Sequence, residues 1–265
     1  MTLREALLAA VERLSGVRTS VCFSGGTDSL CVLWSLLDAG ADVTAYTFRL
    51  ESKVSADARV ARRAADAFGL RHVEVVIPHQ TPQELAADVA ALVRRIGSAR
   101  KTHVECSWPF QYLAAQIVEE EVVCGLNADD LWGSAASVAI NLSRSPDAFR
   151  AHRQRLMADP TTSAWQFIAA EFAARGKRLA SPFRDEQVIE WMLARDWQQL
   201  NRPRQKQPAR QDFAAEFGRA PIWRPNDNLQ CGSGIREYIG RMLLDPAINK
   251  HGHRQIAGLY REWLR

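Results

Sequence analysis

The sequence predicts an α/β protein with a doubly wound parallel sheet and a mainly helical C-terminal half. Up to about residue 145, short β-branched or apolar runs alternate with helical patterns, which is typical of parallel strands joined by crossover helices. A Gly-rich turn follows the first of these runs, at the carboxyl end of a strand, where such sheets bind ligands. We expect a single domain at 1–265, with an α/β core at about 1–145 and a helical part at about 146–265.

The individual elements follow from the spacing of apolar residues and from the residues that end each run. Leu3, Leu7 and Val11 share one face of a predicted helix at 2–14. Strands are predicted where β-branched, aromatic and apolar residues gather, at 21–23, 42–48, 72–78 and 122–124. Further helices are predicted at 30–37, 55–68, 82–96, 148–157, 163–175 and 186–195.

Composition and charge narrow the class of protein. The 265 residues suffice to bury a sizeable core, and no apolar run approaches the length of a membrane span. The N-terminus begins an amphipathic helix rather than a signal peptide, and the five cysteines lack the spacing of a disulfide framework. We therefore expect a cytoplasmic protein with reduced thiols and no membrane partner. The net charge of +4 is compatible with a nucleic-acid partner but does not argue for one.

The most informative stretch is a Gly- and Ser-rich turn between the first predicted strand and its helix. Glycines let a backbone approach a phosphate closely, and a helix start offers N–H groups and a positive dipole end. Serine hydroxyls add donors, and the carboxylate can hold a magnesium ion that shields phosphate charge. The turn consists of Ser24, Gly25, Gly26, Thr27, Asp28 and Ser29. It predicts a phosphate site, with an ordinary βα turn as the simpler alternative.

This turn resembles the PP-loop, Ser-Gly-Gly-x-Asp-Ser, of the ATP pyrophosphatase superfamily. It lacks the Gly-Lys-Ser/Thr ending of the common P-loop. The resemblance implies that ATP is split between its α and β phosphates and that AMP is transferred to an oxygen of the substrate. It also implies that the turn binds the pyrophosphate portion of ATP.

A second cluster of polar residues follows the predicted strand at 122–124. Gly125 ends the strand, and Asp129 and Asp130 come shortly after it. If this strand lies beside the first one, both carboxylates face the triphosphate, and Asp129 can share a magnesium ion with Asp28. A helix N-cap followed by a first-turn acid is the alternative explanation for such a pair.

The stretch from Gly125 to Asp130 resembles the Gly-x-Gly-Ala-Asp-Glu motif of the asparagine synthetase family, which also includes β-lactam-forming synthetases and lasso-peptide cyclases. Asn127 stands where that family has its second glycine, and Asp130 where it has glutamate. The resemblance implies that Asp28 and Asp129 ligate magnesium. It further implies that the adenosine pocket is lined, largely through backbone, by Thr47, Phe48 and Gly125.

Three later segments also resemble this family, so that the similarity runs from about residue 18 to 240. Residues 181–186 are similar to its Pro-Phe-Leu-Asp turn, with Arg184 replacing an apolar residue. Residues 206–213 are similar to its Lys-x-x-x-Arg-x-x-Phe segment, and residues 222–234 to its Trp-Arg-x-Lys loop.

One position in the last loop departs from the family in charge. Asn226 stands where the family has a lysine that stabilises the adenylation transition state. An amide offers only a dipole to developing anionic oxygen, so the change removes electrostatic stabilisation unless another cation replaces it. We expect Lys206 or Arg224 to supply the charge, with Arg210 and Arg236 as further candidates; weak or lost catalysis is the alternative.

These features predict an AMP- and pyrophosphate-forming ligase that uses ATP and Mg²⁺ to activate a carboxylate, or an amide oxygen, and joins it to a nitrogen nucleophile. Asp130 is a candidate base or substrate contact, and the substrate wall is expected to include Arg184 and residues 101–109. The chain begins Met1-Thr2 rather than with the nucleophilic Cys of the family's glutaminase domain. The expected nitrogen donor is therefore free ammonia, a separate amidotransferase or an amine of the substrate itself.

Other functions are compatible with parts of this pattern. A PP-loop enzyme that modifies tRNA or a nucleobase would share the first motif, although the mild charge makes a nucleic-acid partner the weaker hypothesis. A non-catalytic ATP-binding partner subunit would account for Asn226.

The cysteines and histidines form no motif that indicates a function. Cys22, Cys31 and Cys124 fall in apolar runs and are expected in the core, whereas Cys106 and Cys231 are expected in polar loops facing the cleft. The six histidines have no ligand spacing, and His251-Gly-His253 is expected to be a polar turn.

Overall fold

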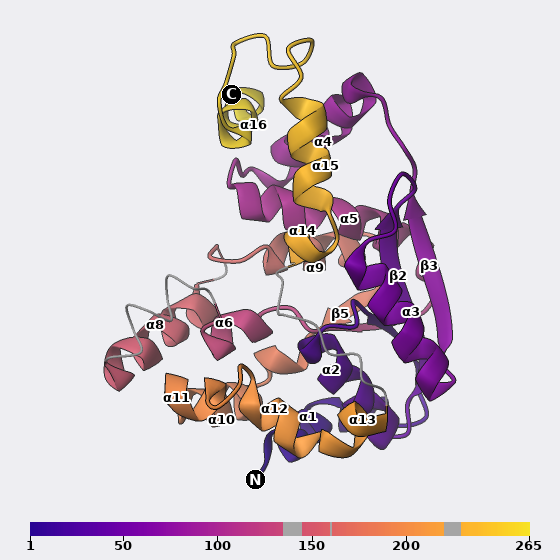
Figure 1. Ribbon diagram of the computed structural model, residues 1–265, viewed down its shortest axis with the longest axis vertical. Coiled ribbons are helices and arrows are strands. Elements are labelled where there is room, and N and C mark those ends of the chain that lie inside the picture. Colours follow the sequence, from indigo (N-terminus) through magenta and orange to yellow (C-terminus); the bar gives the residue numbers. More distant parts are fainter. Residues whose placement is uncertain (135–144, 160, 220–228) are drawn as a thin grey trace.

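Five parallel strands form the central sheet of the computed structural model, which describes residues 1–134, 145–159, 161–219 and 229–265 (Figure 1). The strand order is β3-β2-β1-β4-β5. The strands are β1 (Arg18–Cys22), β2 (Asp42–Leu50), β3 (Arg71–Ile77), β4 (Glu121–Cys124) and β5 (Arg178–Ala180). The chain runs outward from β1 to β3 and then returns to place β4 on the other side of β1. The switch point, where such folds bind ligands, therefore lies between β1 and β4.

Helices cover both faces of this sheet, which confirms the predicted fold class. Successive strand residues alternate between two apolar clusters, as Val21 and Cys22 do on β1. Val21 belongs to the cluster formed with α2 and α3, and Cys22 to the one formed with α5 and α9. The helices that connect the parallel strands are α2 (Thr27–Asp38), α3 (Ala56–Phe68), α4 (Pro82–Ile96), α5 (Lys101–Gln116), α6 (Ala128–Trp132), α8 (Pro146–Ala158) and α9 (Trp165–Ala173).

Most of the remaining helices gather toward the two ends of the molecule (Figure 1). At one end α1 (Leu3–Val11) contacts α2, α10 (Glu186–Leu193) and α12 (Gln207–Asp212). Near them lie α11 (Trp197–Asn201) and α13 (Ala214–Arg219). At the other end α15 (Ile235–Leu243) and α16 (Ile256–Leu264) pack on α4, and α14 (Leu229–Gly232) contacts α15. No helix in the described ranges combines the length and the apolar character that a bilayer span requires.

Some local details of the structure differ from the predictions. Residues 101–116 form the long helix α5, so Cys106 lies in a helix and not in a polar loop. The predicted helix at 2–14 divides into α1 and a 3-10 turn at Glu12–Leu14. The three-residue strand β5 was not predicted, because its sequence is too short to show an alternating pattern.

Candidate functional site

The Gly-rich turn connects β1 to α2 and packs tightly against α3. Gly25 has a φ of 68°, and a Cβ at this position would lie 2.7 Å from Val60 Cγ1 and 2.8 Å from the Ala61 amide nitrogen. The position therefore requires glycine both for its backbone conformation and for its close contact. Within the turn, Ser29 Oγ donates to the Gly26 carbonyl at 3.0 Å, and the Gly26 amide donates to Ser24 Oγ at 3.3 Å. These bonds fix the shape of the turn at the start of α2.

The segment after β4 lies directly beside this turn. A Cβ on Gly125 would stand 3.2 Å from both Asp28 Cβ and the Ser29 amide nitrogen, so the two segments contact each other through backbone. Asn127 has a φ of 69°, and asparagine is one of the few non-glycine residues that tolerate this region. Its side chain donates to Asp130 Oδ2 at 2.9 Å. The local conformation thus explains why asparagine can replace the second glycine of the motif.

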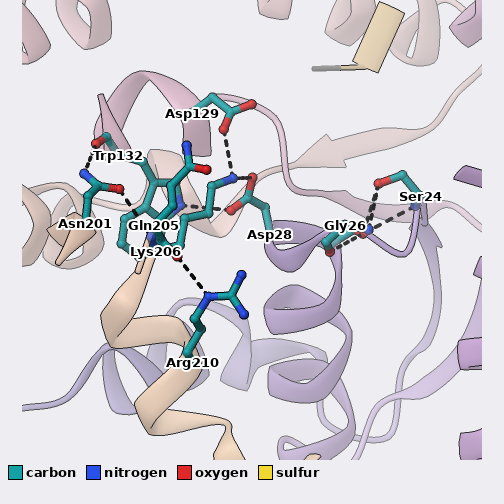
Figure 2. A network of polar contacts seen from close by, with 10 residues as sticks. Ser24, Gly26, Asp28, Asp129, Trp132, Asn201, Gln205, Lys206 and Arg210 are labelled. Carbon is teal, nitrogen blue, oxygen red and sulfur yellow. Dashed lines mark hydrogen bonds and ion pairs between the residues drawn. The ribbon is translucent and has the colours of Figure 1, made fainter. Parts of the chain in front are cut away.

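Two carboxylates from neighbouring segments meet at one ammonium group (Figure 2). Lys206 Nζ lies 2.6 Å from Asp28 Oδ2 and 2.8 Å from Asp129 Oδ1. Asp28 is in the first turn of α2, and Asp129 is in the first turn of α6. Lys206 is 1% exposed and precedes α12. Three separate parts of the chain therefore meet at one buried ion-pair cluster.

A chain of hydrogen bonds holds Lys206 in this position. Its amide donates to Asn201 Oδ1 at 3.2 Å, and Asn201 Nδ2 donates to the Trp132 carbonyl at 2.9 Å. Trp132 Nε1 in turn donates to Asp28 Oδ1 at 2.9 Å. Neither Trp132 nor Asn201 was among the site residues predicted from the sequence. Trp132 closely follows the Asp129-Asp130 pair and could have been predicted as a site residue on that ground. No sequence pattern around Asn201 indicates its role.

The electrostatics of the cluster favour a charged lysine. Burial alone would lower the pKa of Lys206, but the charges of Asp129 and Asp28 and their hydrogen bonds outweigh this effect and raise it. Burial raises the pKa of Asp28, an effect that Lys206 opposes and the nearby Asp129 charge reinforces. Burial also raises the pKa of Asp130, although its bond from Asn127 acts in the opposite direction.

A cavity of about 170 Å³ opens beside these groups. Its apolar wall includes Phe48 of β2, Phe110 and Leu113 of α5, and Leu229 of α14. The predicted binding residues that line it are Ser24, Gly26, Asp28, Ser29, Thr47, Phe48, Gly125, Asp129 and Asp130. Gly25 and Thr27 belong to the same turn but are not among the lining residues. A cavity lined by apolar side chains, by carboxylates and by a Gly-rich turn suits a ligand with a flat ring and a phosphate group.

Of the other predicted cations, Arg210 and Arg236 lie away from Asp28 and Asp129. Arg210 Nε donates to the Gln205 carbonyl at 2.9 Å, on the side of Lys206 away from the carboxylates (Figure 2). Arg236 Nε lies 3.4 Å from Glu105 Oε2 on α5. Arg224, like Asn226, falls outside the described residues.

Of the segments expected in the substrate wall, Arg184 lies next to the site without lining the cavity. Its Nη1 donates to Asn127 Oδ1 at 3.4 Å. Residues 101–109 occupy the first half of α5, and the cavity is lined instead by Phe110 and Leu113 further along this helix. Cys231 lies in α14, where it is exposed, so its predicted place in a polar loop was wrong. Cys22, Cys31 and Cys124 are buried as expected.

A parallel sheet with a Gly-rich turn and paired acids at its switch point defines an ATP-binding PP-loop domain. The model of the asparagine synthase family matches residues 2–204. Because this match covers most of the chain, the protein belongs to the asparagine synthase family, which confirms the resemblance found in the motifs up to residue 204. The resemblances at 206–213 and 222–234 lie beyond the matched residues. No curated protein matches the sequence.

Two solved structures show more distant likeness. One is a predicted subunit of tRNA methyltransferase from Methanocaldococcus jannaschii, 11% identical, with a TM-score of 0.39 over 80% of this chain and 93% of that one. The other is the U34-tRNA thiolase NcsA from Methanococcus maripaludis with its 4Fe–4S cluster, 10% identical, with a TM-score of 0.34 over 99% of this chain and 78% of that one. At these TM-scores neither structure supports an inference about activity.

Proposed function

We propose that this protein is an AMP- and pyrophosphate-forming carbon–nitrogen ligase that activates a carboxylate, or an amide oxygen, with ATP. The observation that carries the proposal is the convergence of Asp28, Asp129 and Lys206 beside the Gly-rich turn. Two acids and a lysine at this point can hold both a divalent cation and phosphate oxygens, which adenylation requires.

ATP is proposed to lie along the cavity with its phosphates at the turn. The residues assigned to pyrophosphate are Ser24, Gly25, Gly26, Thr27 and Ser29. Thr47, Phe48 and Gly125 are assigned to adenosine, since all three line the cavity. Thr47 Oγ1 already donates to the Phe23 carbonyl at 2.5 Å, which favours an adenosine contact through backbone.

Asp28 and Asp129 are proposed to hold Mg²⁺. Their carboxylates already face one cationic nitrogen from two sides, and carboxylate oxygens are the ligands that Mg²⁺ prefers. When bound, the ion would neutralise charge on the phosphates. The Asp129 side chain is 46% exposed, so it can turn toward a ligand without first breaking core packing.

Lys206 is proposed to supply the positive charge that Asn226 cannot. It is buried within the cluster that faces the phosphate turn, and a fixed cation there stabilises developing negative charge strongly because water is excluded. Arg224 remains a second candidate for this role.

The proposed reaction has two steps. A substrate oxygen attacks the α-phosphorus, the new O–P bond forms, and pyrophosphate leaves with the electrons of the broken bond. A nitrogen then attacks the activated carbon, the C–N bond forms and AMP leaves. Asp130 lines the cavity and has a raised pKa because of burial, so it is suited to accept the proton that the nitrogen loses.

The nitrogen donor and the cellular setting belong to the same proposal. Ammonia, a separate amidotransferase or an amine of the substrate would each provide the nucleophile. The five free cysteines fit a reducing cytoplasm.

The test is ATP–pyrophosphate isotope exchange with Mg²⁺, in the presence of pooled amino acids or, separately, bulk tRNA. We expect exchange that depends on a carboxylic acid and falls by about 10²-fold or more in Asp28→Asn. Asp66→Asn, which removes an exposed carboxylate of α3, should leave exchange unchanged.

Other outcomes would reject the proposal in distinct ways. Exchange that requires tRNA would indicate a nucleic-acid-modifying enzyme. ATP binding without exchange in any pool would indicate a non-catalytic partner, and restored exchange in Asn226→Lys would then identify the missing charge as the cause.

A further inference from the structure

A second cluster of ligand-type side chains lies at the C-terminal end of the molecule, remote from α12 and the Gly-rich turn (Figure 1). His251 Nδ1 and His253 Nε2 each lie 2.9 Å from Glu262 Oε2. The three ligand atoms lie within 4.8 Å of one another, and no other such group of three occurs in the described part of the chain. The histidines are in the segment between α15 and α16, and Glu262 is on α16.

The surrounding backbone fixes the position of His253. Asn249, which is 8% exposed, donates from Nδ2 to the His253 carbonyl at 2.7 Å and accepts from the His253 amide at 2.8 Å. A Cβ on Gly258 would lie 2.6 Å from His253 Nδ1, so the imidazole fills the space that glycine leaves open. His253 is therefore held in place by contacts that do not involve Glu262.

The helix that carries Glu262 is anchored on its other face. Ile256, Leu259 and Tyr260 are buried in the apolar cluster formed with α4, α5 and α15. Glu262 lies on the outer face and is 37% exposed at its side chain. Core packing of α16 thus fixes the backbone position of Glu262 independently of its hydrogen bonds with the histidines.

We propose that His251, His253 and Glu262 form a Zn²⁺ site that ties the segment after α15 to α16. Two imidazole nitrogens and one carboxylate oxygen are a common ligand set for zinc, with water in the fourth position. Two ligands about 2.0–2.1 Å from a tetrahedral ion lie roughly 3.3 Å apart, so the 2.9 Å separations need only a small expansion. This site is independent of the proposed ligase activity.

The inference is tested by titrating the whole protein with Zn²⁺ against a chromophoric chelator in Mg²⁺-free buffer. We expect one equivalent to bind, and Co²⁺ to give the visible absorption of a site with nitrogen and oxygen ligands. His251→Gln and Glu262→Gln should each weaken binding by more than about tenfold, because even outer-shell partners contribute that much. Zn²⁺ should raise the melting temperature of the parent protein and not of these variants.

Control variants distinguish Zn²⁺ binding at this site from Zn²⁺ binding to other side chains. His79→Gln removes another exposed imidazole, Cys231→Ser removes the exposed thiol, and Asp28→Asn alters the PP-loop cluster; all three should retain binding. His251 is 69% exposed, so its replacement does not disturb the core, and lost binding cannot be attributed to misfolding. Absence of stoichiometric binding, or binding that persists in His251→Gln and Glu262→Gln, would overturn the inference.

Discussion

Lys206 and Asn127 both have positive φ angles, of 58° and 69°. Such a conformation costs a non-glycine residue about 1–2 kcal/mol, and both residues lie in the candidate site. In Lys206 the cost is offset by the amide bond to Asn201 and by two ion pairs. In Asn127 it is offset by the side-chain bond to Asp130. In the described part of the chain, both non-glycine residues with a positive φ thus belong to the candidate site.

Lys206→Gln tests whether the lysine and Mg²⁺ use the same two carboxylates. Removing one partner of a buried charge cluster typically destabilises a protein by about 3–5 kcal/mol, so we expect a lower melting temperature without divalent ions. Mg²⁺ should raise the melting temperature of Lys206→Gln more than that of the parent, because the competing ammonium is gone.

Lys53→Gln is the matched control, since Lys53 forms an exposed ion pair with Glu237. Loss of this pair should change neither the melting temperature nor its response to Mg²⁺ appreciably. An equal response to Mg²⁺ in the parent and in Lys206→Gln, measured by thermal unfolding, would show that the ion does not bind between Asp28 and Asp129.

At the scale of elements, the turn between β1 and α2 is shaped by α3 as much as by its own sequence. The Gly25 backbone contacts Val60 and Ala61 so closely that a side chain has no room. The sequence predicted the turn because its glycines and hydroxyls are consecutive, but it did not reveal this contact.

Gly25→Ala should therefore lower both stability and ATP affinity. The positive φ alone costs about 1–2 kcal/mol, and the clash with α3 should add roughly 1–3 kcal/mol. Gly16→Ala is an unusually close control, because Gly16 has a φ of 70° and open space around its Cβ position.

Denaturant unfolding and ATP titration of both variants separate the two contributions. Gly16→Ala should be destabilised only by the cost of the positive φ, and it should keep the ATP affinity of the parent. Equal free energies of unfolding in the two variants would refute the role assigned to the contact with α3.

Helix α5 was not predicted, because its sequence lacks the usual features of a helix. Its buried residues include His103, Glu105 and Trp108 along with Pro109 in its interior. Because polar and apolar residues are buried together, no amphipathic period marks the helix, and proline normally argues against one. Its packing against β2, β3 and α9 decides the conformation.

At the scale of the whole molecule, Arg153 connects the helical half to the site. This buried arginine of α8 donates to the carbonyls of Leu131 at 3.0 Å, Met192 at 2.9 Å and Arg195 at 2.7 Å. Its guanidinium also lies 3.9 Å from the centre of the Phe149 ring. Because Leu131 is in α6, beside Asp129, this one side chain joins α8 and α10 to the segment that carries the acid.

Arg153→Met should destabilise the protein by about 3 kcal/mol or more, since three carbonyls lose a charged donor. It should also weaken ATP binding through displacement of α6. Arg155→Met, on an exposed position of the same helix, should affect neither property. Denaturant unfolding and ATP titration of the two variants provide the comparison, and a stable Arg153→Met with normal ATP affinity would contradict this role.

The alternating fold class, the Gly-rich turn and the acids after β4 could all be predicted from the sequence. These features are local, because hydrogen bonding and backbone conformation in a turn or a helix start depend on consecutive residues. Only the folded structure shows that Lys206 contacts Asp28, 178 residues away, and Asp129, 77 residues away. The same holds for the contacts of Glu262 with two histidines. Such contacts depend on strand order and on how helices pack, and no short sequence pattern encodes either.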